Sequence, residues 1–527
     1  MKTIHYCFPL TIILLNFSLI SLSNALFPPN PTSSDSICNI TPYPKFCKSA
    51  LPQNRSTTIY DCGRLSLQRS LANSRTLLSF INKKLSQNRN NLALQDCQSL
   101  LSTNLDFLSE AAETIKSSNK LAGSRSVDIE TVISATLTNI QTCLEGLNEL
   151  SSPVLNEISP ALTNSSMSCS VSLALFKNGF VSDDSTKRGR RLLDTRRRLL
   201  EFTPPSGVNI TTLVVVNPDG SGNYTTINDA INAAPNNTKA GKGYYAIHVV
   251  AGVYEENVLI ATNKKYLMMI GDGINQTIIT GNRSVDDGWT TFNSATFAVT
   301  GTAFVAMNIT FRNTAGAIKH QAVAMRSGAD LSAFYSCSFE AYQDTLYTHS
   351  LRQFYKDCDI YGTVDFIFGN AAVVLQSCNI YPRLPMQGQF NAITAQGRTD
   401  INQNTGTSIQ DCTIKAADDL ASSNGTTRTY LGRPWKEYSR TVFMQSSMDS
   451  LIDPAGWREW SGDFALSTLY YAEFNNTGPG SNTSSRVTWP GYQVIDETDA
   501  ANFTVSSFLA GEFWLPATGV PFTSGLL

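Results

Sequence analysis

The sequence predicts a two-domain protein, with an all-α helix bundle followed by an all-β parallel β-helix. A chain of 527 residues is longer than one ordinary domain, and its content of 42% apolar and 16% charged residues is typical of packed globular protein. Apolar residues recur at helical spacing only before about residue 180, whereas a repeat of about 20 residues appears after residue 213. This change of periodicity separates the two domains.

Residues 1–25 have the features of a signal peptide. Lys2 precedes an apolar stretch, and the small residues of Ser23-Asn24-Ala25 suit cleavage after Ala25. We therefore expect a secreted protein. A signal anchor is the alternative, and no later stretch of sequence is long and apolar enough to span a bilayer. About a dozen Asn-x-Ser/Thr sequons after residue 25 agree with the secretory route and with glycosylation, as at Asn164, Asn209, Asn275 and Asn424.

Residues 26–185 form the predicted helical domain. Ile133, Leu137, Ile140, Leu144 and Leu147 recur at steps of 4, 3, 4 and 3, which places them on one face of a helix. We interpret this apolar stripe as a face that packs into the core of a helix bundle.

Residues 186–205 form a strongly basic segment between the two domains. This segment contains two copies of Arg-Arg-Leu-Leu. A basic run between domains is often only a solvated linker, but a duplicated dibasic sequence in a secreted chain favours proteolytic processing. We therefore predict cleavage at one of the pairs Arg190-Arg191 and Arg197-Arg198.

Charge is distributed unevenly along the chain. Residues 1–200 contain 21 Lys/Arg and 14 Asp/Glu, a net charge of +7, whereas residues 201–527 contain 19 and 28, a net charge of −9. The two halves are therefore electrostatically complementary. No aromatic residues or nucleic-acid motifs accompany the basic run, and we expect no nucleic-acid partner.

Residues 206–527 form the predicted β-helix. Short β-prone runs are separated by Gly, Asn and Asp, and the segments "NITF", "CSFE", "CDIY", "CNIY" and "CTIK" mark equivalent strands. Cys337, Cys358, Cys378 and Cys412 in this repeat are separated by 21, 20 and 34 residues, so that the last step contains an inserted loop. One coil per 20 residues without helices favours a parallel β-helix over a sandwich or a propeller. We expect Cys358 and Cys378, on neighbouring coils, to form a disulfide; stacked free thiols are the alternative.

The same repeat places four polar residues side by side. Gln321, Gln343 and Asp365 are separated by 22 and 22 residues, and Asp344 precedes Asp365 by 21. Residues one coil apart stack at about 4.8 Å, so these four side chains should gather on one face. Two such close carboxylates in apolar surroundings cannot both ionise normally, which yields one proton donor and one nucleophile.

The glutamines favour ester hydrolysis at this site. Carboxylates about 5 Å apart also suit a retaining glycosidase, but paired amides can donate hydrogen bonds to the oxyanion that acyl transfer forms. The alternative for Gln321 and Gln343 is a structural amide ladder. We expect no metal or cofactor, because the chain has four histidines without ligand spacing, no CxxC pair, no Gly-x-Ser-x-Gly and no phosphate-binding loop.

From about residue 210 to 527 the chain resembles plant-type pectin methylesterases, and its helical region resembles their inhibitor-like pro-domain, whose family includes invertase inhibitors. The motifs that carry the first resemblance are "GVYEE" at 252–256, "QAVAMR" at 321–326, "YQDTLY" at 342–347, "YGTVDFIFGN" at 361–370 and "LGRPW" at 431–435. The resemblance implies a right-handed parallel β-helix and a four-helix bundle. It also implies the disulfides Cys38–Cys47 and Cys97–Cys143, and leaves the state of Cys62 and Cys169 open.

The resemblance further implies the reaction and the site. Asp365 would attack the C6 methyl ester of homogalacturonan, and Asp344 would serve as proton donor and then as base. Gln343 and Gln321 would stabilise the oxyanion of each intermediate. Arg433 would orient the nucleophile, and Thr291, Gln321, Arg433 and Trp435 would contact the substrate.

The implied partners are pectin, the protein's own pro-domain or separate inhibitor proteins, and a processing protease. The mature enzyme would be a monomer of the cell wall, without membrane attachment after removal of the signal. Two residues depart from the family pattern: Ala341 replaces a Gly, and Asn308 replaces an Asp and creates a sequon. We expect Asn308 to lie inside a strand and to remain unglycosylated.

Two other functions compete with this interpretation. A pectin-degrading glycosidase or lyase could use the same fold, but it would shorten the polysaccharide chain. Alternatively, the protein could be an inhibitor with an inert β-domain, against which the complete set of Gln321, Gln343, Asp344, Asp365 and Arg433 argues.

Overall fold

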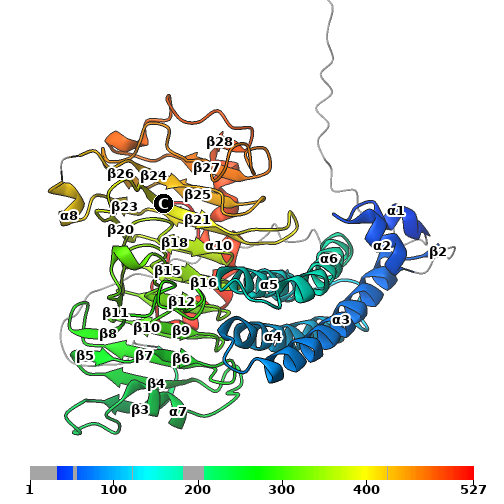
Figure 1. Ribbon diagram of the computed structural model, residues 1–527, viewed down its shortest axis with the longest axis horizontal. Coiled ribbons are helices and arrows are strands. Elements are labelled where there is room, and N and C mark those ends of the chain that lie inside the picture. The colour runs from blue at the N-terminus through cyan, green and yellow to red at the C-terminus, as the bar shows by residue number, and fades with distance from the viewer. Residues whose placement is uncertain (1–31, 52–55, 122, 182–206, 424) are drawn as a thin grey trace, which may run out of the picture.

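The structure is a computed structural model that describes residues 32–51, 56–121, 123–181, 207–423 and 425–527 (Figure 1). The predicted signal peptide at 1–25 and the predicted processing residues Arg190, Arg191, Arg197 and Arg198 lie outside these residues. Within the described part, no helix combines the length and apolarity needed to cross a membrane.

The helical region is a four-helix bundle preceded by a short helical hairpin. The hairpin consists of α1 (Ser34–Cys38) and α2 (Pro44–Ala50), and its flanking strands β1 (Thr32–Ser33) and β2 (Ser56–Thr57) pair antiparallel. The bundle consists of α3 (Ile59–Gln87), α4 (Leu92–Ile115), α5 (Gly123–Glu149) and α6 (Leu155–Gly179). Short connections between long helices favour antiparallel neighbours, and the helices run up and down in sequence order (Figure 1).

Apolar packing and two disulfides hold this bundle together. In the predicted stripe on α5, Ile133, Leu137, Ile140 and Leu147 are buried, whereas Leu144 is only half-buried. Both disulfides implied by the resemblance are present: Cys38–Cys47 joins α1 to α2, and Cys97–Cys143 joins α4 to α5. The two remaining cysteines of the bundle, Cys62 and Cys169, are buried free thiols.

The second region is a parallel β-helix of three sheets. Sheet 1 contains eleven strands: β3 (Ile210–Val216), β4 (Tyr244–Val249), β7 (Leu267–Gly271), β10 (Val305–Met307), β13 (Ser332–Tyr335), β16 (Arg352–Lys356), β19 (Ala372–Gln376), β22 (Gly406–Gln410), β25 (Arg440–Met444), β27 (Tyr470–Phe474) and β28 (Tyr492–Val494). Sheet 2 contains eight: β5 (Gly252–Glu255), β8 (Thr277–Gly281), β11 (Thr310–Asn313), β14 (Ser338–Glu340), β17 (Asp359–Gly362), β20 (Asn379–Pro382), β23 (Thr413–Ile414) and β26 (Ser447–Met448). Sheet 3 contains seven: β6 (Val258–Ile260), β9 (Phe297–Val299), β12 (Met325–Ser327), β15 (Leu346–Thr348), β18 (Ile367–Gly369), β21 (Asn391–Gln396) and β24 (Thr429–Gly432).

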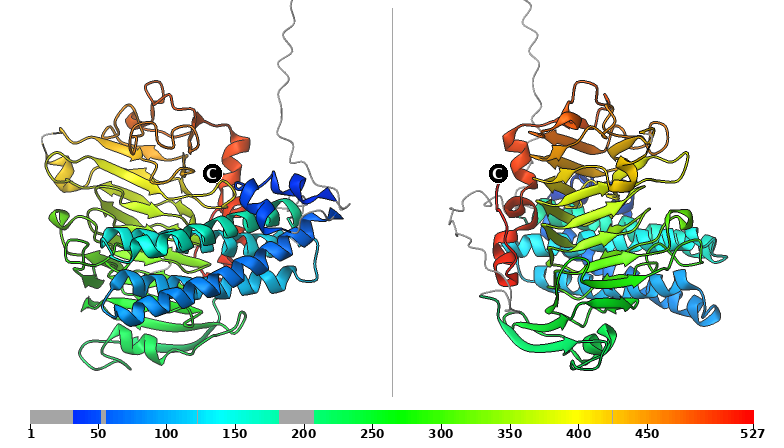
Figure 2. Two further views of the ribbon diagram at one scale, coloured as in Figure 1. Left: turned by 45° about the vertical axis from the view of Figure 1, so that its right-hand side comes forward. Right: turned by 90° about the vertical axis from the view of Figure 1, so that its left-hand side faces the viewer.

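Each coil visits sheet 3, then sheet 1, then sheet 2, as in the series β12, β13, β14. Short helices α7 (Ile227–Ala233), α8 (Asp418–Ala421), α9 (Glu497–Ala500) and α10 (Val505–Leu509) lie outside the coils. The C-terminal segment that contains α10 packs Val505, Leu509 and Trp514 on the outer face of sheet 1 (Figure 2). The bundle packs on sheet 3 instead, where Tyr347 and Phe368 join its apolar core.

Left-handed residues make successive corners between sheet 1 and sheet 2. At five successive corners this residue has φ between 49° and 58°, and the next residue points into the apolar interior; the corner residues are Asn308, Ser336, Asp357, Ser377 and Asp411. Asn and Asp tolerate this conformation better than bulky or β-branched residues. Asn308 therefore lies at a corner between β10 and β11, and the expectation that it lies inside a strand is wrong.

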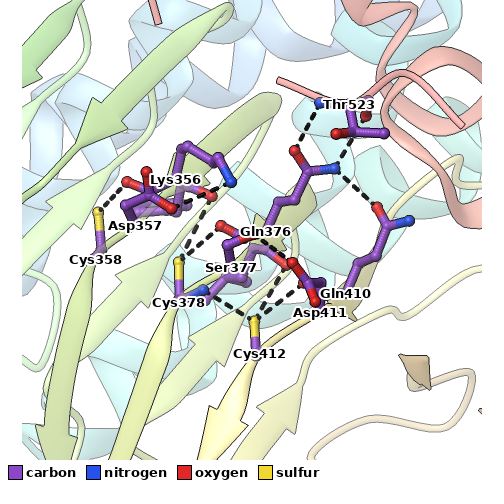
Figure 3. A network of polar contacts seen from close by, with 12 residues as sticks. Lys356, Asp357, Cys358, Gln376, Ser377, Cys378, Gln410, Asp411, Cys412 and Thr523 are labelled. Carbon is purple, nitrogen blue, oxygen red and sulfur yellow. Dashed lines mark hydrogen bonds and ion pairs between the residues drawn. The ribbon is translucent and has the colours of Figure 1, made fainter. Parts of the chain in front are cut away.

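The predicted disulfide between Cys358 and Cys378 is absent, and both are free thiols (Figure 3). The Cys358 Sγ donates to the Phe334 carbonyl at 3.5 Å, and the Cys378 Sγ donates to the Tyr355 carbonyl at 3.6 Å. In-register parallel strands keep stacked β-carbons about 4.8 Å apart and their Cβ bonds parallel, whereas a disulfide needs about 3.8 Å. The spacing of the coils places the two cysteines side by side, but the direction of their Cβ bonds keeps the sulfur atoms from bonding.

Candidate active site

The four predicted polar residues lie at consecutive corners that lead into sheet 3. Gln321 precedes β12, Gln343 and Asp344 precede β15, and Asp365 precedes β18. All four line one cavity of about 240 Å³. Asp344 and Asp365 have φ values of 63° and 53°, a left-handed conformation that aspartate tolerates and that repeats from one coil to the next.

Arg433 fixes one of the two carboxylates. Its Nε donates to Asp365 Oδ1 at 2.8 Å, and its Nη2 donates to Asp365 Oδ2 at 2.7 Å. The guanidinium also lies 4.3 Å from the centre of the Trp460 ring. This two-pronged contact requires the planar fork of arginine, which lysine lacks.

The electrostatics distinguish the two carboxylates. Burial raises the pKa of Asp344 well above its usual value, and the neighbouring charges of Asp365 and Glu149 raise it further. Burial also raises the pKa of Asp365, but hydrogen bonds and charge from Arg433 oppose that rise. At neutral pH, Asp344 is therefore the better proton donor and Asp365 the better carboxylate nucleophile.

An aromatic row forms the floor beside these carboxylates. Tyr347 and Phe368 stack with ring centres 4.1 Å apart. Phe368 and Trp435 meet edge to face, with ring centres 5.9 Å apart. Gly397 permits the position of Trp435, because a Cβ there would lie 2.8 Å from the indole ring. Flat apolar surfaces of this kind suit sugar rings. Sequence reasoning had missed Tyr347, Phe368 and Trp460, although an aromatic residue follows Asp344 and Asp365 by three positions each.

Helix α5 lies along this groove. A polar stripe on α5, at steps of 4, 4, 3 and 4 residues, contacts the β-helix opposite the apolar stripe of the bundle core. The contacting pairs are Ser134 with Asn404, Thr138 with Asn370, Thr142 with His349, Glu145 with Lys436, and Glu149 with Thr291. These contacts reach loops of several coils, so α5 covers the groove that contains Asp344 and Asp365.

Glu149 reaches the candidate active site itself. Thr291, the predicted substrate-contacting threonine, donates both its backbone N–H and its Oγ1 hydroxyl to the Glu149 carboxylate at 2.9 Å. Glu149 and Glu145 line the same cavity as Asp344 and Asp365. A carboxylate of the bundle therefore occupies the position that the resemblance assigns to substrate.

A buried carboxylate pair, two amide donors and an aromatic groove on a parallel β-helix define a hydrolase built to act on a polysaccharide. The family model described as Pectinesterase matches residues 213–512, and the model described as Plant invertase/pectin methylesterase inhibitor matches residues 32–175. The chain belongs to the pectinesterase family and carries an inhibitor-like domain at its N-terminal side.

Named relatives agree with this assignment. "Probable pectinesterase/pectinesterase inhibitor 41" of Arabidopsis thaliana is 56% identical over 94% of this chain and 95% of its own length. "Pectinesterase 2" of Citrus sinensis is 47% identical over 98% of this chain and 99% of its own. The solved pectin methylesterase from carrot is 56% identical with a TM-score of 0.59, and it covers 62% of this chain and 100% of its own. That share is about the length of the β-helical region.

Proposed function

We propose that the β-helix hydrolyses C6 methyl esters of homogalacturonan through an aspartyl acyl-enzyme. The Asp365 carboxylate attacks the ester carbonyl, while the amides of Gln343 and Gln321 donate hydrogen bonds to the oxyanion. Collapse of this intermediate breaks the bond to the methoxy group, and Asp344 gives that oxygen its proton, so that methanol leaves.

The second half of the reaction reverses these roles. Ionised Asp344 takes a proton from water, which attacks the acyl carbon. The bond to Asp365 breaks, the aspartate returns as a carboxylate, and the galacturonate unit leaves with a free carboxyl group. The observation that carries this proposal is the fork of Arg433 on Asp365, in one cavity with Asp344 and both glutamines.

Methanol release from methylated pectin tests the reaction. Residues 207–527 should release methanol without shortening the polysaccharide, and Asp365→Asn should lower the rate by about 10³-fold or more. Asparagine tolerates the left-handed backbone at this position, so this variant should fold. Chain shortening, measured by size-exclusion chromatography, would instead indicate a glycosidase or lyase. No activity in either form would favour an inert β-domain.

We further propose that the docked bundle inhibits the esterase until the basic linker is cleaved. We also propose that the chain is secreted to the cell wall and that a processing protease cleaves the linker. The placement of α5 over the groove and the contact of Glu149 with Thr291 support this role. A chain with Arg190, Arg191, Arg197 and Arg198 all changed to Gln should stay uncleaved and nearly inactive. Equal activity of this chain and the cleaved protein would refute inhibition by the bundle.

A further inference from the structure

Aromatic rings hold the guanidinium of Arg433 in addition to its fork on Asp365. The carbon at the centre of the guanidinium lies 4.3 Å from the centre of the Trp460 ring and 5.2 Å from that of the Phe390 ring. An aromatic face attracts a cation through its π electrons. The two hydrogen bonds to Asp365 therefore fix the edge of the guanidinium, whereas the rings limit the movement of its flat face.

The two rings face different cavities. Trp460 lines the cavity of the candidate active site, together with Arg433 and Asp365. Phe390 does not line that cavity and instead lines a separate one of about 820 Å³, together with Arg458. Phe390 thus contacts Arg433 from outside the space that the ester would occupy. An effect of Phe390 on the reaction would therefore pass through Arg433.

The Phe390 ring is itself held in place by two neighbours. The guanidinium of Arg458 lies 4.1 Å from the centre of the ring. Tyr430 meets the ring edge to face, with ring centres 5.8 Å apart, and its hydroxyl accepts a hydrogen bond from Arg458 Nη1 at 3.5 Å. Arg458 and Tyr430 therefore restrain the ring that contacts Arg433.

The coil repeat brings these residues together from successive coils. Asp365 lies shortly before β18, and Phe390 directly before β21, which pairs with both β18 and β24. Arg433 directly follows β24, and the Arg458 backbone N–H donates to the carbonyl of the preceding Gly432 at 3.0 Å. Two guanidinium groups this close along the solenoid repel each other, and the Phe390 ring that they share attracts both.

We propose that Phe390 and Arg458 are positioning residues that hold Arg433 in its fork on Asp365. This proposal rests on the proposed esterase function and adds the residues that keep its nucleophile oriented. Arg458 fixes the ring, and the ring limits the movement of Arg433. Without the ring, the long side chain of Arg433 regains rotamer freedom and leaves the fork for a larger fraction of the time. Asp365 is then less well aligned with the ester and more easily protonated.

The test uses the protein with its basic linker cleaved and measures methanol release across pH 4–9. Phe390→Leu removes the ring but keeps an apolar side chain. It should lower kcat about tenfold and move the acid limb of the kcat profile upward by about 0.5 pH units, with KM changed less than about twofold. Phe390→Tyr keeps the ring and should restore both values. Arg458→Met should move the acid limb in the same direction by a smaller amount.

Two controls separate positioning from a general structural effect. Tyr381→Leu removes a ring from another cation–aromatic contact, with Lys415 on sheet 2, and should keep the wild-type kcat and acid limb. In protein that already carries Arg433→Gln, Phe390→Leu should move the acid limb no further, because Arg433 transmits its effect.

Carbodiimide labelling of Asp365 reads its protonation without turnover, because carbodiimides react with protonated carboxyl groups. Located by mass spectrometry of peptides, this labelling should extend to higher pH in Phe390→Leu than in the wild type. An unchanged acid limb and labelling profile in Phe390→Leu, or an equal shift with and without Arg433→Gln, would overturn the positioning role. Absence of methanol release by the wild type would instead overturn the esterase proposal, and the labelling would still decide the role of Phe390.

Discussion

At the residue scale, the guanidinium of Arg433 distinguishes two otherwise similar carboxylates. Both are buried at corresponding corners of neighbouring coils, and both share the left-handed backbone. Only Asp365 has two hydrogen bonds from an arginine, which oppose the rise of its pKa on burial. The proposed assignment of Asp365 as nucleophile and Asp344 as proton donor therefore depends on a residue 68 positions further along the chain than Asp365.

Removing the charge of Arg433 should make the enzyme inactive at acidic pH. In Arg433→Gln the pKa of Asp365 rises further, so the carboxylate is protonated at a higher pH and the acid limb of the kcat profile moves upward. We expect kcat to fall by about 10²-fold or more, which methanol release measures across pH 4–9. Arg433→Lys should keep the acid limb near its wild-type position but recover only part of kcat, because lysine cannot form the fork. An unchanged acid limb in Arg433→Gln would contradict the role of Arg433.

At the element scale, α5 is a helix with two packing faces. Every residue from 131 to 140 is buried, because the apolar stripe faces the bundle and the polar stripe faces the β-helix. Gly146 brings the helix close to the groove: a Cβ there would lie 3.4 Å from Thr290 Cγ2. A Cβ at this distance makes ordinary van der Waals contact, so the further atoms of a leucine would press on Thr290 or enter the cavity that Gly146 lines.

Gly146→Leu should therefore weaken docking and activate the uncleaved protein. Leucine favours helix over glycine by about 0.8 kcal/mol, so α5 itself should not be weakened. We expect methanol release by the uncleaved chain to rise several-fold. Gly123→Leu, at the first residue of the same helix with nothing within 4 Å, is the matched control and should stay silent. Thermal unfolding of both variants checks that the bundle remains folded, and equal activities would argue against docking through Gly146.

The column of cysteines inside the β-helix is a second feature at this scale. Burial raises the pKa of Cys358 and of Cys412 well above the usual value, which keeps them as thiols. Secreted protein without residues 1–25 should show six reactive thiols after denaturation without reductant, and essentially none before it. A count of four would mean that two of these six cysteines form a further disulfide, and peptide mapping would then show whether they are Cys358 and Cys378.

At the scale of the whole molecule, the charges at the interface are opposite to those of the two halves. The bundle contributes Asp96, Glu145 and Glu149, whereas the β-helix contributes Arg326 and Lys436. The net charges of +7 and −9 correctly predict that the two halves are complementary. At the contact itself, however, the bundle is the acidic partner and the β-helix the basic one. Part of the basic excess lies in the linker, in the two Arg-Arg-Leu-Leu copies.

Docking of the cleaved bundle should weaken as pH rises from about 4 to 7. Burial raises the pKa of Asp96 from 3.8 to about 7, against the opposing effects of Thr290 and Arg326, and burial also raises the pKa of Glu149, which faces Thr291, Glu145 and Lys436. The docked state binds protons that the separated state releases, so docking is strongest below both pKa values. Across this range each pH unit weakens the free energy of docking by up to about 1.4 kcal/mol for each of these carboxyl groups.

Size-exclusion chromatography of the cleaved protein measures this dependence. We expect the two fragments to migrate together at pH 5 and to separate at pH 8. In Asp96→Asn, which cannot ionise, the dependence should be shallower. Co-migration that is independent of pH in the wild type would mean that these carboxyl groups do not control docking.

The sequence by itself determined the two fold types, the coil repeat and the grouping of Gln321, Gln343, Asp344 and Asp365, because in a solenoid a constant spacing along the chain becomes adjacency in space. It did not predict the free thiols, whose pairing depends on the direction of each Cβ bond. Nor did it predict that α5 lies over the groove, because the partners of its polar stripe are up to 291 residues away, as Lys436 is from Glu145.

Only the tertiary structure shows which residues of the bundle contact the groove. The bundle brings Glu149 to Thr291, and Asp96 to Thr290 and Asn293, beside Arg326. None of these contacts follows the coil repeat of the sequence, because each joins a residue of the helical bundle to a residue of the β-helix. The grouping of the polar residues was therefore predictable from the repeat, whereas the contacts that the bundle makes with the groove depend on how the two domains dock.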